Sequence, residues 1–494
     1  MVNPQKRLVI VSNRLPVIID KINGGWEVKE GSGGLVTALA PVLRNRGGVW
    51  IGWPGTVMND EVETLLTSET RDTGYQLKPV TLTSYEIDKY YHGFANEIIW
   101  PLFHDLQSRC NFDPEFWQVY QAVNKKFAEV ILQNTKTDDY IWVHDYQLMN
   151  VAKEMRVSNP QIKVGFFMHI PFPSLDIFLK LPWRHELLSS LLEYDLIGFQ
   201  TMRDRRNFIQ CVKTLVKDVA VQGKGQVLTV LSRDRKIKVG HFPISIDYKY
   251  FVDKTATQEV SDCAWFIHEN LNDRQILLGI DRLDYTKGII ERLKAFENAL
   301  IRYPELRGKA SFIQIVVPSR TGITEYNTLR SEIEETVGNI NGRFTKYGWV
   351  PIHYIFGSLD FYELLAYYKS SEIAVITPLK DGMNLVAKEY CACSLDGNGV
   401  LILSEFAGAS AQLHRGAIMV NPYDVDKVAD AIYQAFKMNA DEKITRMRKM
   451  RHSIKKQDVF WWVDSFLQAA FTENLNNFPV LEHYDYMPQI EIST

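Results

Sequence analysis

The amino-acid sequence predicts an α/β protein built on doubly wound parallel sheets. Short apolar runs that suit buried strands alternate with segments whose apolar residues recur at helical spacing. Residues 276–280 form one such run, and Ile289, Leu293, Phe296 and Leu300 follow on one helical face. Strands that alternate with helices in this way are typical of a parallel sheet covered by helices.

Strands are expected throughout the chain. In the second half they are expected at 276–280, 312–317, 352–356, 373–377, 400–403 and 417–420. The first half follows the same alternation with longer insertions, and its clearest strands are expected at 8–11, 140–143, 164–168, 196–199 and 236–242. The pattern therefore indicates two α/β units of similar size.

Three helices of the second half are predicted from their apolar faces. In chain order, these faces comprise Leu329, Ile333 and Val337; Phe361, Leu364, Leu365 and Tyr368; and Val425, Val428, Ile432 and Phe436. Ser358 is expected to cap the second of these helices and Asp424 to open the third. The charged run at 441–456 is interpreted as the solvated face of a further helix.

The length of 494 residues is too great for one ordinary core, so more than one domain is expected. Residues 243–247 are the expected crossing point between two Rossmann-like domains, one over 1–245 and one over 246–457. The aromatic run at 460–462 is expected to be buried. Its burial would return the last helix, over 458–485, to the first domain.

The composition excludes several classes of partner. The net charge of −3 is too small for a protein that binds nucleic acid, and no apolar stretch approaches the roughly 20 residues of a membrane-spanning helix. The five cysteines are scattered, and Cys391-Ala392-Cys393 lacks a partner pair for a zinc site. We therefore expect a cytoplasmic protein with reduced thiols.

Unusual polar residues cluster just beyond the carboxyl ends of the predicted strands, where a doubly wound sheet places its ligands. These clusters lie at 12–14, 144–145, 169, 281–288, 319–320 and 381–384. Because they come from both predicted sheets, we expect them to line one cleft between two domains.

The segment Gly31-Ser32-Gly33-Gly34 runs into a predicted helix at 35–39. Glycines let backbone N–H groups approach a phosphate at a helix N-terminus, so this turn could bind one. An ordinary flexible turn explains the motif equally well. It is not a Walker A loop, because no Gly-Lys-Ser/Thr follows.

Arg282 and Lys287 stand on either side of Asp284, next to Gly288, which opens a helix. Two cations at a helix N-terminus suit a diphosphate that departs as an anion. The alternative is a surface ion pair with Asp281 or Asp284. The position in a strand-to-helix turn favours the ligand.

Residues 381–389 form another candidate ligand segment. Asp381 could accept sugar hydroxyls, the amides of the following helix could meet a phosphate, and Glu389 could hold a ribose diol. Asp-Gly is also a common turn, so a purely structural role stays open.

Two residue pairs of the first half are weaker candidates. Asp145 and His169 could be a general base and its partner, or buried hydrogen-bonded groups. Tyr91 and Trp100 could form an aromatic wall for a sugar, although aromatic residues at such spacing are more often core.

Two patterns are not found in the sequence. No pair of carboxylates with separate acid and nucleophile roles stands out, which argues against a glycosidase. No Asp-x-Asp motif lies beside a predicted strand, so phosphate charge would be met by Arg and Lys and not by a divalent ion.

A series of long motifs runs in order along almost the whole chain. They are Ser12-Asn13-Arg14-Leu15-Pro16, Gly33-Gly34-Leu35, the segment 50–55, His144-Asp145-Tyr146, His169-Ile170-Pro171-Phe172-Pro173, Asp281-Arg282-Leu283-Asp284-Tyr285, Pro318-Ser319-Arg320, the segment 381–390, Ser404-Glu405-Phe406-Ala407-Gly408 and the 458–462 region. By these motifs the chain resembles the trehalose-6-phosphate synthases and their relatives, the retaining glycosyltransferases of family 20. The resemblance implies a GT-B fold, in which two Rossmann-like doubly wound domains face each other across a cleft. The N-terminal domain would bind the acceptor and the C-terminal domain the nucleotide sugar.

The resemblance implies a glucosyltransferase of trehalose biosynthesis. It would move glucose from UDP-glucose to glucose 6-phosphate with retention of configuration, giving α,α-trehalose 6-phosphate and UDP. The leaving phosphate would help to deprotonate the acceptor hydroxyl in a same-face displacement, with no metal and no cofactor besides the donor substrate. The expected partners are small molecules only, without nucleic acid or membrane, and a homo-oligomer is left open.

The resemblance also assigns roles by position. The acceptor-binding residues would be Arg14, Tyr91, Trp100, Asp145 and Arg320. The catalytic residues would be Arg282, Lys287, Asp145 and His169. The donor-binding residues would be Gly33, Gly34, His169, Arg282, Lys287, Leu359, Asp381, Met383, Asn384, Leu385, Val386, Ala387, Lys388 and Glu389, and no metal ligand is implied.

Three positions depart from the family pattern. Gln147 stands where histidine is usual, Lys380 replaces an arginine, and the segment 320–324 lacks an aspartate near the expected acceptor phosphate. The last departure leaves open another acceptor such as glycerol 3-phosphate, as in the glucosylglycerol-phosphate synthases. Those relatives lack the intact Ser-Asn-Arg and Gly-Gly-Leu segments. A non-catalytic regulatory member is the other alternative, and it predicts erosion at Arg282, Lys287 or Asp381, which are all intact.

Overall fold

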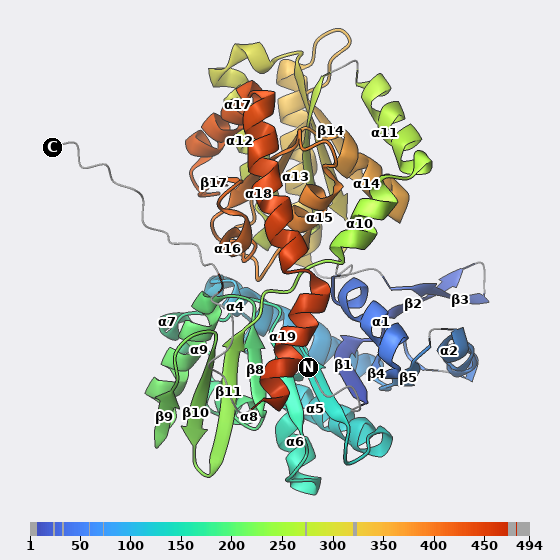
Figure 1. Ribbon diagram of the computed structural model, residues 1–494, viewed down its shortest axis with the longest axis vertical. Helices are drawn as coiled ribbons and strands as arrows, with labels where there is room; N and C mark the ends of the chain where they lie inside the picture. The colour runs from blue at the N-terminus through green and yellow to red at the C-terminus, as the bar shows by residue number, and fades with distance from the viewer. Residues whose placement is uncertain are drawn as a thin grey trace, which may run out of the picture. The chain divides into compact units, whose positions relative to one another are not determined.

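The computed structural model describes residues 7–22, 25–31, 34–58, 60–72, 74–271, 274–319, 324–472 and 481. The chain divides into two compact units (Figure 1). One contains the chain up to Ile244 together with Phe460–Leu481, and the other contains Ser245–Val459. Each unit has its own parallel sheet, as the alternation of strands and helices predicts.

The first unit is built on a nine-stranded sheet in the order β5-β4-β1-β6-β7-β8-β11-β10-β9. All neighbours from β5 to β11 are parallel, whereas β10 and β9 are antiparallel additions. The strands are β1 Leu8–Arg14, β4 Gly48–Trp53, β5 Gln76–Pro79, β6 Tyr140–His144, β7 Val164–Phe167, β8 Leu196–Phe199, β9 Val219–Gln222, β10 Val227–Ser232 and β11 Arg235–His241, with a separate hairpin of β2 Val17–Ile22 and β3 Gly25–Glu30. The parallel strands therefore follow the Rossmann order. The chain adds strands towards one side of the sheet from β1 to β5 and towards the other side from β6 onward, so the reversal point of this sheet lies between β1 and β6.

The helices of this unit include one unusual element. They are α1 Gly34–Arg46, α2 Asp60–Asp72, α3 Ser84–Glu86, η1 Ile87–Ile99, α4 Trp100–Phe103, η2 Gln107–Arg109, α5 Pro114–Asn134, η3 Tyr146–Leu148, α6 Val151–Ser158, α7 Leu175–Phe178, α8 Arg184–Leu191, α9 Met202–Leu215 and α19 Val459–Phe471. The segment η1 is a π-helix of 13 residues. π-Helices are rare and usually brief, and nothing in the sequence pattern predicts this one.

The second unit contains a six-stranded, fully parallel sheet in the order β14-β13-β12-β15-β16-β17. Its strands are β12 Gln275–Arg282, β13 Ala310–Val317, β14 Ile352–Phe356, β15 Ile373–Ile376, β16 Val400–Ser404 and β17 Ile418–Val420. Its helices are α10 Tyr248–Thr255, α11 Gln258–Asn270, η4 Tyr285–Lys287, α12 Ile289–Arg302, η5 Pro304–Leu306, α13 Thr324–Phe344, α14 Phe361–Ser370, α15 Leu385–Cys393, α16 Ser410–Leu413, α17 Val425–Lys437 and α18 Ala440–Lys456. This is again the Rossmann order, and it reverses between β12 and β15.

The predicted apolar faces are largely confirmed in this unit. Ile289, Leu293, Phe296 and Leu300 of α12 are buried in the core, and α17 begins after Asp424, whose side chain caps it. The predicted cap of α14 is wrong. Asp360, not Ser358, caps this helix, because its carboxylate and that of Glu363 form a reciprocal capping box.

The last helix, α19, packs on the sheet of the first unit (Figure 1). The ring of Phe466 stacks on Trp142 of β6 with a centroid distance of 4.2 Å. Gly165 and Gly198 make room for it, because a Cβ on either residue would lie about 3 Å from the Phe466 ring. The prediction that 460–462 is buried holds only for Trp462, since Phe460 is 37% exposed.

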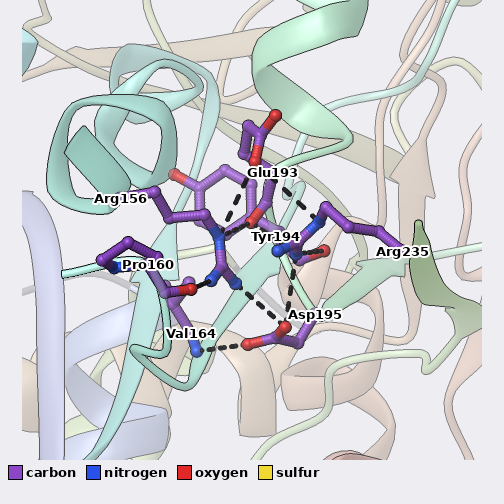
Figure 2. A network of polar contacts seen from close by, with 7 residues as sticks. All are labelled: Arg156, Pro160, Val164, Glu193, Tyr194, Asp195 and Arg235. Atoms are coloured by element: carbon purple, nitrogen blue, oxygen red, sulfur yellow. Dashed lines mark hydrogen bonds and ion pairs between the residues drawn. The ribbon is translucent and has the colours of Figure 1, made fainter. Parts of the chain in front are cut away.

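A polar network joins the amino-terminal ends of three strands in the first unit. Figure 2 shows Asp195, just before β8, accepting hydrogen bonds from Arg156 at 2.9 Å and from the backbone N–H of Val164 at 2.9 Å. Arg235, the first residue of β11, also contacts Asp195. This network holds together the amino-terminal ends of the strands, whereas ligands of such sheets bind beyond the carboxyl-terminal ends.

Among the described residues, no helix combines the length and the apolar character needed to cross a bilayer. All five cysteines are free, and Cys211, Cys391 and Cys393 are buried.

Candidate active site

The reversal point of the second sheet brings two loops of the chain together. In a Rossmann sheet, ligands bind beyond the carboxyl ends of the strands at this point. Arg282 ends β12, and the loop 283–288 follows it, whereas the loop after β15 carries 381–384. The two loops touch, because the backbone N–H of Leu379 donates to the carbonyl of Thr286 at 2.8 Å. The predicted donor residues of both loops therefore lie in one region of the unit.

The turn after β12 is shaped by an aspartate and a glycine. Asp284 accepts hydrogen bonds from the N–H and the hydroxyl of Thr286, both at 2.9 Å. Gly288 has φ 62°, and a Cβ there would overlap the carbonyl oxygen of Thr377. Arg282 is the last residue of β12 and its side chain is exposed. An exposed arginine thus precedes a turn that only glycine can close.

Lys287 and Asp381 form the centre of the site. The Nζ atom of Lys287 lies 2.6 Å from Oδ2 of Asp381, and both side chains are largely buried. Asn384 donates to the same carboxylate oxygen at 3.2 Å. Asn384 adopts φ 76° and caps α15, because its Oδ1 accepts the N–H of Ala387 at 3.1 Å. The ion pair of Lys287 is therefore with Asp381, whereas the alternative predicted from the sequence was Asp281 or Asp284.

The loop after β16 holds the backbone of Asp381–Met383 in place. The N–H of Asp381 donates to the carbonyl of Phe406, and the N–H of Ala409 donates to the carbonyl of Met383 at 2.7 Å. Gly408 must be glycine, because a Cβ would overlap the carbonyl oxygen of Gly382. The segment 404–408 is one of the motifs that carry the family resemblance, and the contact of Gly408 with Gly382 gives a physical reason for its glycine.

A buried ion pair beneath the site was missed by sequence reasoning. Arg292 of α12 is 1% exposed and donates to Asp281 at 2.7 Å, to Thr377 at 3.2 Å and to the carbonyl of Lys287 at 3.2 Å. Burial raises the pKa of Asp281 although Arg292 opposes the shift. The available signal was an arginine standing within the apolar face of α12.

The first turns of α15 carry the remaining donor candidates. Leu385 and Val386 are half-buried, Ala387 is buried, and Leu359 is half-buried before α14. The Tyr368 hydroxyl donates to Glu389 at 2.8 Å, and burial raises the pKa of Glu389. Lys388 is fully buried, and this burial lowers its pKa to about 7.

Lys388 predicts a measurable pH effect. Its pKa falls from 10.5 to about 7 on folding, so between these values the unfolded chain binds the proton more tightly. Burial of Lys388 therefore destabilises the folded state most at about pH 7 and below, and this cost decreases as the pH rises from about 7 towards 10. We expect Lys388→Met to raise the melting temperature relative to wild type at pH 7 and to lose most of this advantage as the pH rises to about 9.5. Thermal unfolding of both proteins across this range tests it. Lys294→Met, at an exposed position of α12, is the control, and a Lys388→Met advantage independent of pH would contradict the expectation.

The reversal point of the first sheet gathers the predicted acceptor residues. Arg14 ends β1, and its guanidinium lies 4.7 Å from the ring centroid of Trp53. Tyr91 packs on the same indole, with a centroid distance of 5.8 Å. Gly55 has φ 94°, and a Cβ there would overlap the Arg14 guanidinium. Arg14 and Tyr91 therefore both contact the same tryptophan, Trp53.

Asp145 follows β6 at this same reversal point. It has φ 76°, a strained conformation for a residue other than glycine. Its Oδ1 accepts the N–H of Tyr146 at 3.0 Å and the main-chain N–H of His169 at 3.1 Å. The predicted pairing of Asp145 with His169 is thus made through the backbone of the histidine and not through its ring. Trp100 is buried and packs on Tyr146, with ring centroids 5.8 Å apart.

Gly33 and Arg320 lie outside the described residues, while Gly34 is the first residue of α1. Within the described ranges, no cluster of three or more His, Cys, Asp or Glu side chains could hold a metal ion.

The fold and the site define a class of protein. Two sheets of Rossmann order, one of which presents two cations and a helix N-terminus at its reversal point, are the arrangement of a two-domain protein that binds anionic, nucleotide-like ligands.

Similarity to known proteins gives the family. The model of glycosyltransferase family 20 matches residues 6–471. The chain is 42% identical over 468 residues to a trehalose-6-phosphate synthase of Mycobacterium leprae, covering 93% of this chain and 94% of that protein. It is 40% identical to the UDP-forming α,α-trehalose-phosphate synthase A of Dictyostelium discoideum, covering 94% of this chain and 62% of that longer protein. The chain belongs to glycosyltransferase family 20.

Solved structures agree. A UDP-forming α,α-trehalose-phosphate synthase from Burkholderia xenovorans, in complex with glucose-6-phosphate, matches with a TM-score of 0.85 and 33% identity over 94% of this chain and 99% of its own. An E. coli structure bound with UDP-2-fluoro glucose matches with a TM-score of 0.84 and 34% identity over the same shares. The predicted GT-B fold class and the resemblance to the trehalose-6-phosphate synthases are confirmed.

Proposed function

We propose that this chain transfers glucose from UDP-glucose to glucose 6-phosphate, forming α,α-trehalose 6-phosphate and UDP. The observation that carries the proposal is the cluster of Lys287, Asp381 and Asn384 at the N-terminus of α15. It offers a cation and a helix N-terminus to a diphosphate, together with a carboxylate that can accept sugar hydroxyls. The family and the ligands named for its solved relatives support the same reaction.

The donor is bound by the second unit in this proposal, with help from His169. Arg282 and Lys287 balance the charge of the departing diphosphate. The residues that position the glucose, diphosphate, ribose and base are Gly33, Gly34, His169, Leu359, Asp381, Met383, Asn384, Leu385, Val386, Ala387, Lys388 and Glu389. The Lys287–Asp381 pair holds both side chains ready before the donor arrives. Less reorganisation is then needed when the diphosphate and the sugar hydroxyls replace this contact.

The acceptor is bound by the first unit. Arg14, Tyr91, Trp100, Asp145 and Arg320 are the proposed contacts for the sugar phosphate. The guanidinium of Arg14 lies over the ring of Trp53, which limits its freedom. A guanidinium held in this way suits the bidentate recognition of a phosphate. Asp145 is held by two backbone N–H groups and can orient an acceptor hydroxyl.

Retention of configuration follows from a same-face displacement. The bond between the anomeric carbon and the diphosphate breaks while the acceptor hydroxyl approaches from the same side. An oxygen of the leaving phosphate takes the hydroxyl proton, so positioning and stabilisation of the departing anion supply the catalysis. Arg and Lys carry out this stabilisation, and we propose that no metal is required. A cytoplasmic location is also proposed.

One assay tests the function directly. Purified protein is incubated with UDP-glucose and, in separate reactions, glucose 6-phosphate or glycerol 3-phosphate, with and without EDTA. UDP release and the product mass are measured. We expect trehalose 6-phosphate from glucose 6-phosphate, unaffected by EDTA. Turnover with glycerol 3-phosphate alone would identify another acceptor, and no turnover with either would favour a non-catalytic role.

A further inference from the structure

A chain of hydrogen bonds connects His169 to Ile244, where the chain leaves the first unit. Gln200 follows β8, and its Oε1 accepts the backbone N–H of Ile244 at 2.9 Å. Its Nε2 lies 3.3 Å from Nδ1 of His169. The Nε2 of His169 in turn lies 3.1 Å from Nδ1 of His144. We refer to Gln200, His169 and His144 as the histidine relay.

The backbone N–H of Ile244, at one end of the relay, determines which atom donates and which accepts in each of its hydrogen bonds. A backbone N–H can only donate, so Ile244 must face the amide oxygen of Gln200. The Gln200 amide nitrogen therefore faces His169 and donates to its Nδ1. His169 must then carry its proton on Nε2 and donate to Nδ1 of His144. Only one tautomer of each histidine satisfies every contact.

The relay also opposes protonation of His169. A second proton on this ring would have to occupy Nδ1, which already faces the amide N–H of Gln200. Burial acts in the same direction, since it lowers the pKa of His169 to about 3 and that of His144 well below its usual range. Three rings contact the His169 ring in the described part of the chain, those of His144 of β6, Phe167 of β7 and Trp462 of α19. The Gln200 amide faces its Nδ1, and the Asp145 carboxylate accepts its main-chain N–H.

Packing alone does not explain the relay. His144 is fully buried, and its Nε2 has no hydrogen-bond partner among the described residues. A buried donor without a partner costs stability, and an apolar side chain here would avoid that cost. The relay therefore has another use. Because both His169 nitrogens are engaged inside the protein, His169 can meet a sugar only through its ring carbons and its main chain.

We propose that Gln200 and His144 are positioning residues that hold His169 neutral and in one tautomer beside the transferred glucose. This inference rests on the proposed donor role of His169. As the bond to the diphosphate breaks, positive charge develops on the sugar ring, and an imidazolium next to it would oppose that charge. The relay excludes the imidazolium, and it connects the ring to Ile244, where the chain leaves the first unit for the second.

The sharpest variant is Gln200→Glu. The carboxylate can still accept the Ile244 N–H, but it faces Nδ1 of His169 with an acceptor and so stabilises the imidazolium. We expect kcat to fall about 10- to 100-fold near pH 6.5 and to recover towards wild type as the pH rises to 9. The KM values should change little. The measurement is the ratio of variant to wild-type kcat across pH, and a ratio that does not vary with pH overturns the proposal.

A pair of His144 variants separates positioning from packing. In His144→Asn the amide oxygen takes the place of Nδ1 and still accepts the His169 proton, whereas in His144→Leu nothing does. We expect His144→Asn to retain kcat within a few-fold and His144→Leu to lose about tenfold or more. Gln226→Met is the matched control, because Gln226 is a buried glutamine of the same unit that donates to the carbonyl of His241 at 2.8 Å. Equal kcat in the two His144 variants overturns the proposal.

The tautomer can be read without any turnover. In protein with ¹⁵N-labelled histidine, NMR should show His169 at pH 7 as a neutral ring with its proton on Nε2, and the signal is assigned from its loss in His169→Asn. A proton on Nδ1, or a charged ring, overturns the inference even if the enzyme makes trehalose 6-phosphate. Absence of wild-type turnover with the expected tautomer would instead count against the proposed function alone.

Discussion

Replacing Arg282 with alanine is expected to lower kcat about 100- to 1,000-fold, the usual effect of removing a group that stabilises a developing anion. The melting temperature should stay within a few degrees of wild type. Arg282 ends β12 with an exposed side chain, and no ion pair to it is found among the residues that the structure describes. The fold loses little when such a side chain is removed, while the departing diphosphate loses a cation.

Steady-state kinetics with both substrates and thermal unfolding measure this prediction. Arg302→Ala is the matched control, because Arg302 is a partly exposed arginine of α12 that pairs with Asp430 at 2.8 Å, outside the site. The control should keep its kcat. An Arg282→Ala enzyme with wild-type turnover would remove Arg282 from leaving-group stabilisation, and a large fall in melting temperature would show that its role is structural.

Arg292→Met is expected to have the opposite profile, with a large loss of stability. Removing one partner of a buried ion pair costs about 3–5 kcal/mol, because the other charge stays buried without compensation. Here the stranded group is Asp281, and the contacts to Thr377 and to the carbonyl of Lys287 are lost as well. The melting temperature should fall by roughly 6–20 °C for a unit of this size.

Thermal unfolding tests this, with Lys294→Met as the exposed control on the same helix. The double variant Asp281→Leu/Arg292→Met should recover part of the loss, because it removes the stranded carboxylate. A single variant as stable as the control would contradict the buried-pair argument. Since Arg292 also bonds the turn that carries Lys287, we expect the folded variant to lose turnover too.

The two arginines show how far sequence reasoning extends into the site. Arg282 was found because it follows a predicted strand, and the sheet rule assigns ligands to that position. Arg292 was missed because helical periodicity treats a charged residue in an apolar face as an exception without saying what it pairs with. Its partner Thr377 lies at the end of another strand, and no local pattern connects them. The capping of α14 by Asp360 and the π-helix η1 were missed for a related reason: several cap residues compete within one turn, and π-helices have no periodic signature.

By itself, the sequence determined the alternation of strands and helices, the family, and the types of residue that follow the carboxyl ends of the strands. These features are local or positional, so the spacing of apolar residues and the order of motifs suffice to predict them. Only the tertiary structure decided the strand order that creates two reversal points, the contact between Lys287 and Asp381 across 94 residues of chain, and the direction of the histidine relay. Such contacts depend on which strands become neighbours, and strand pairing is set by packing over the whole sheet and not by the sequence within any one strand.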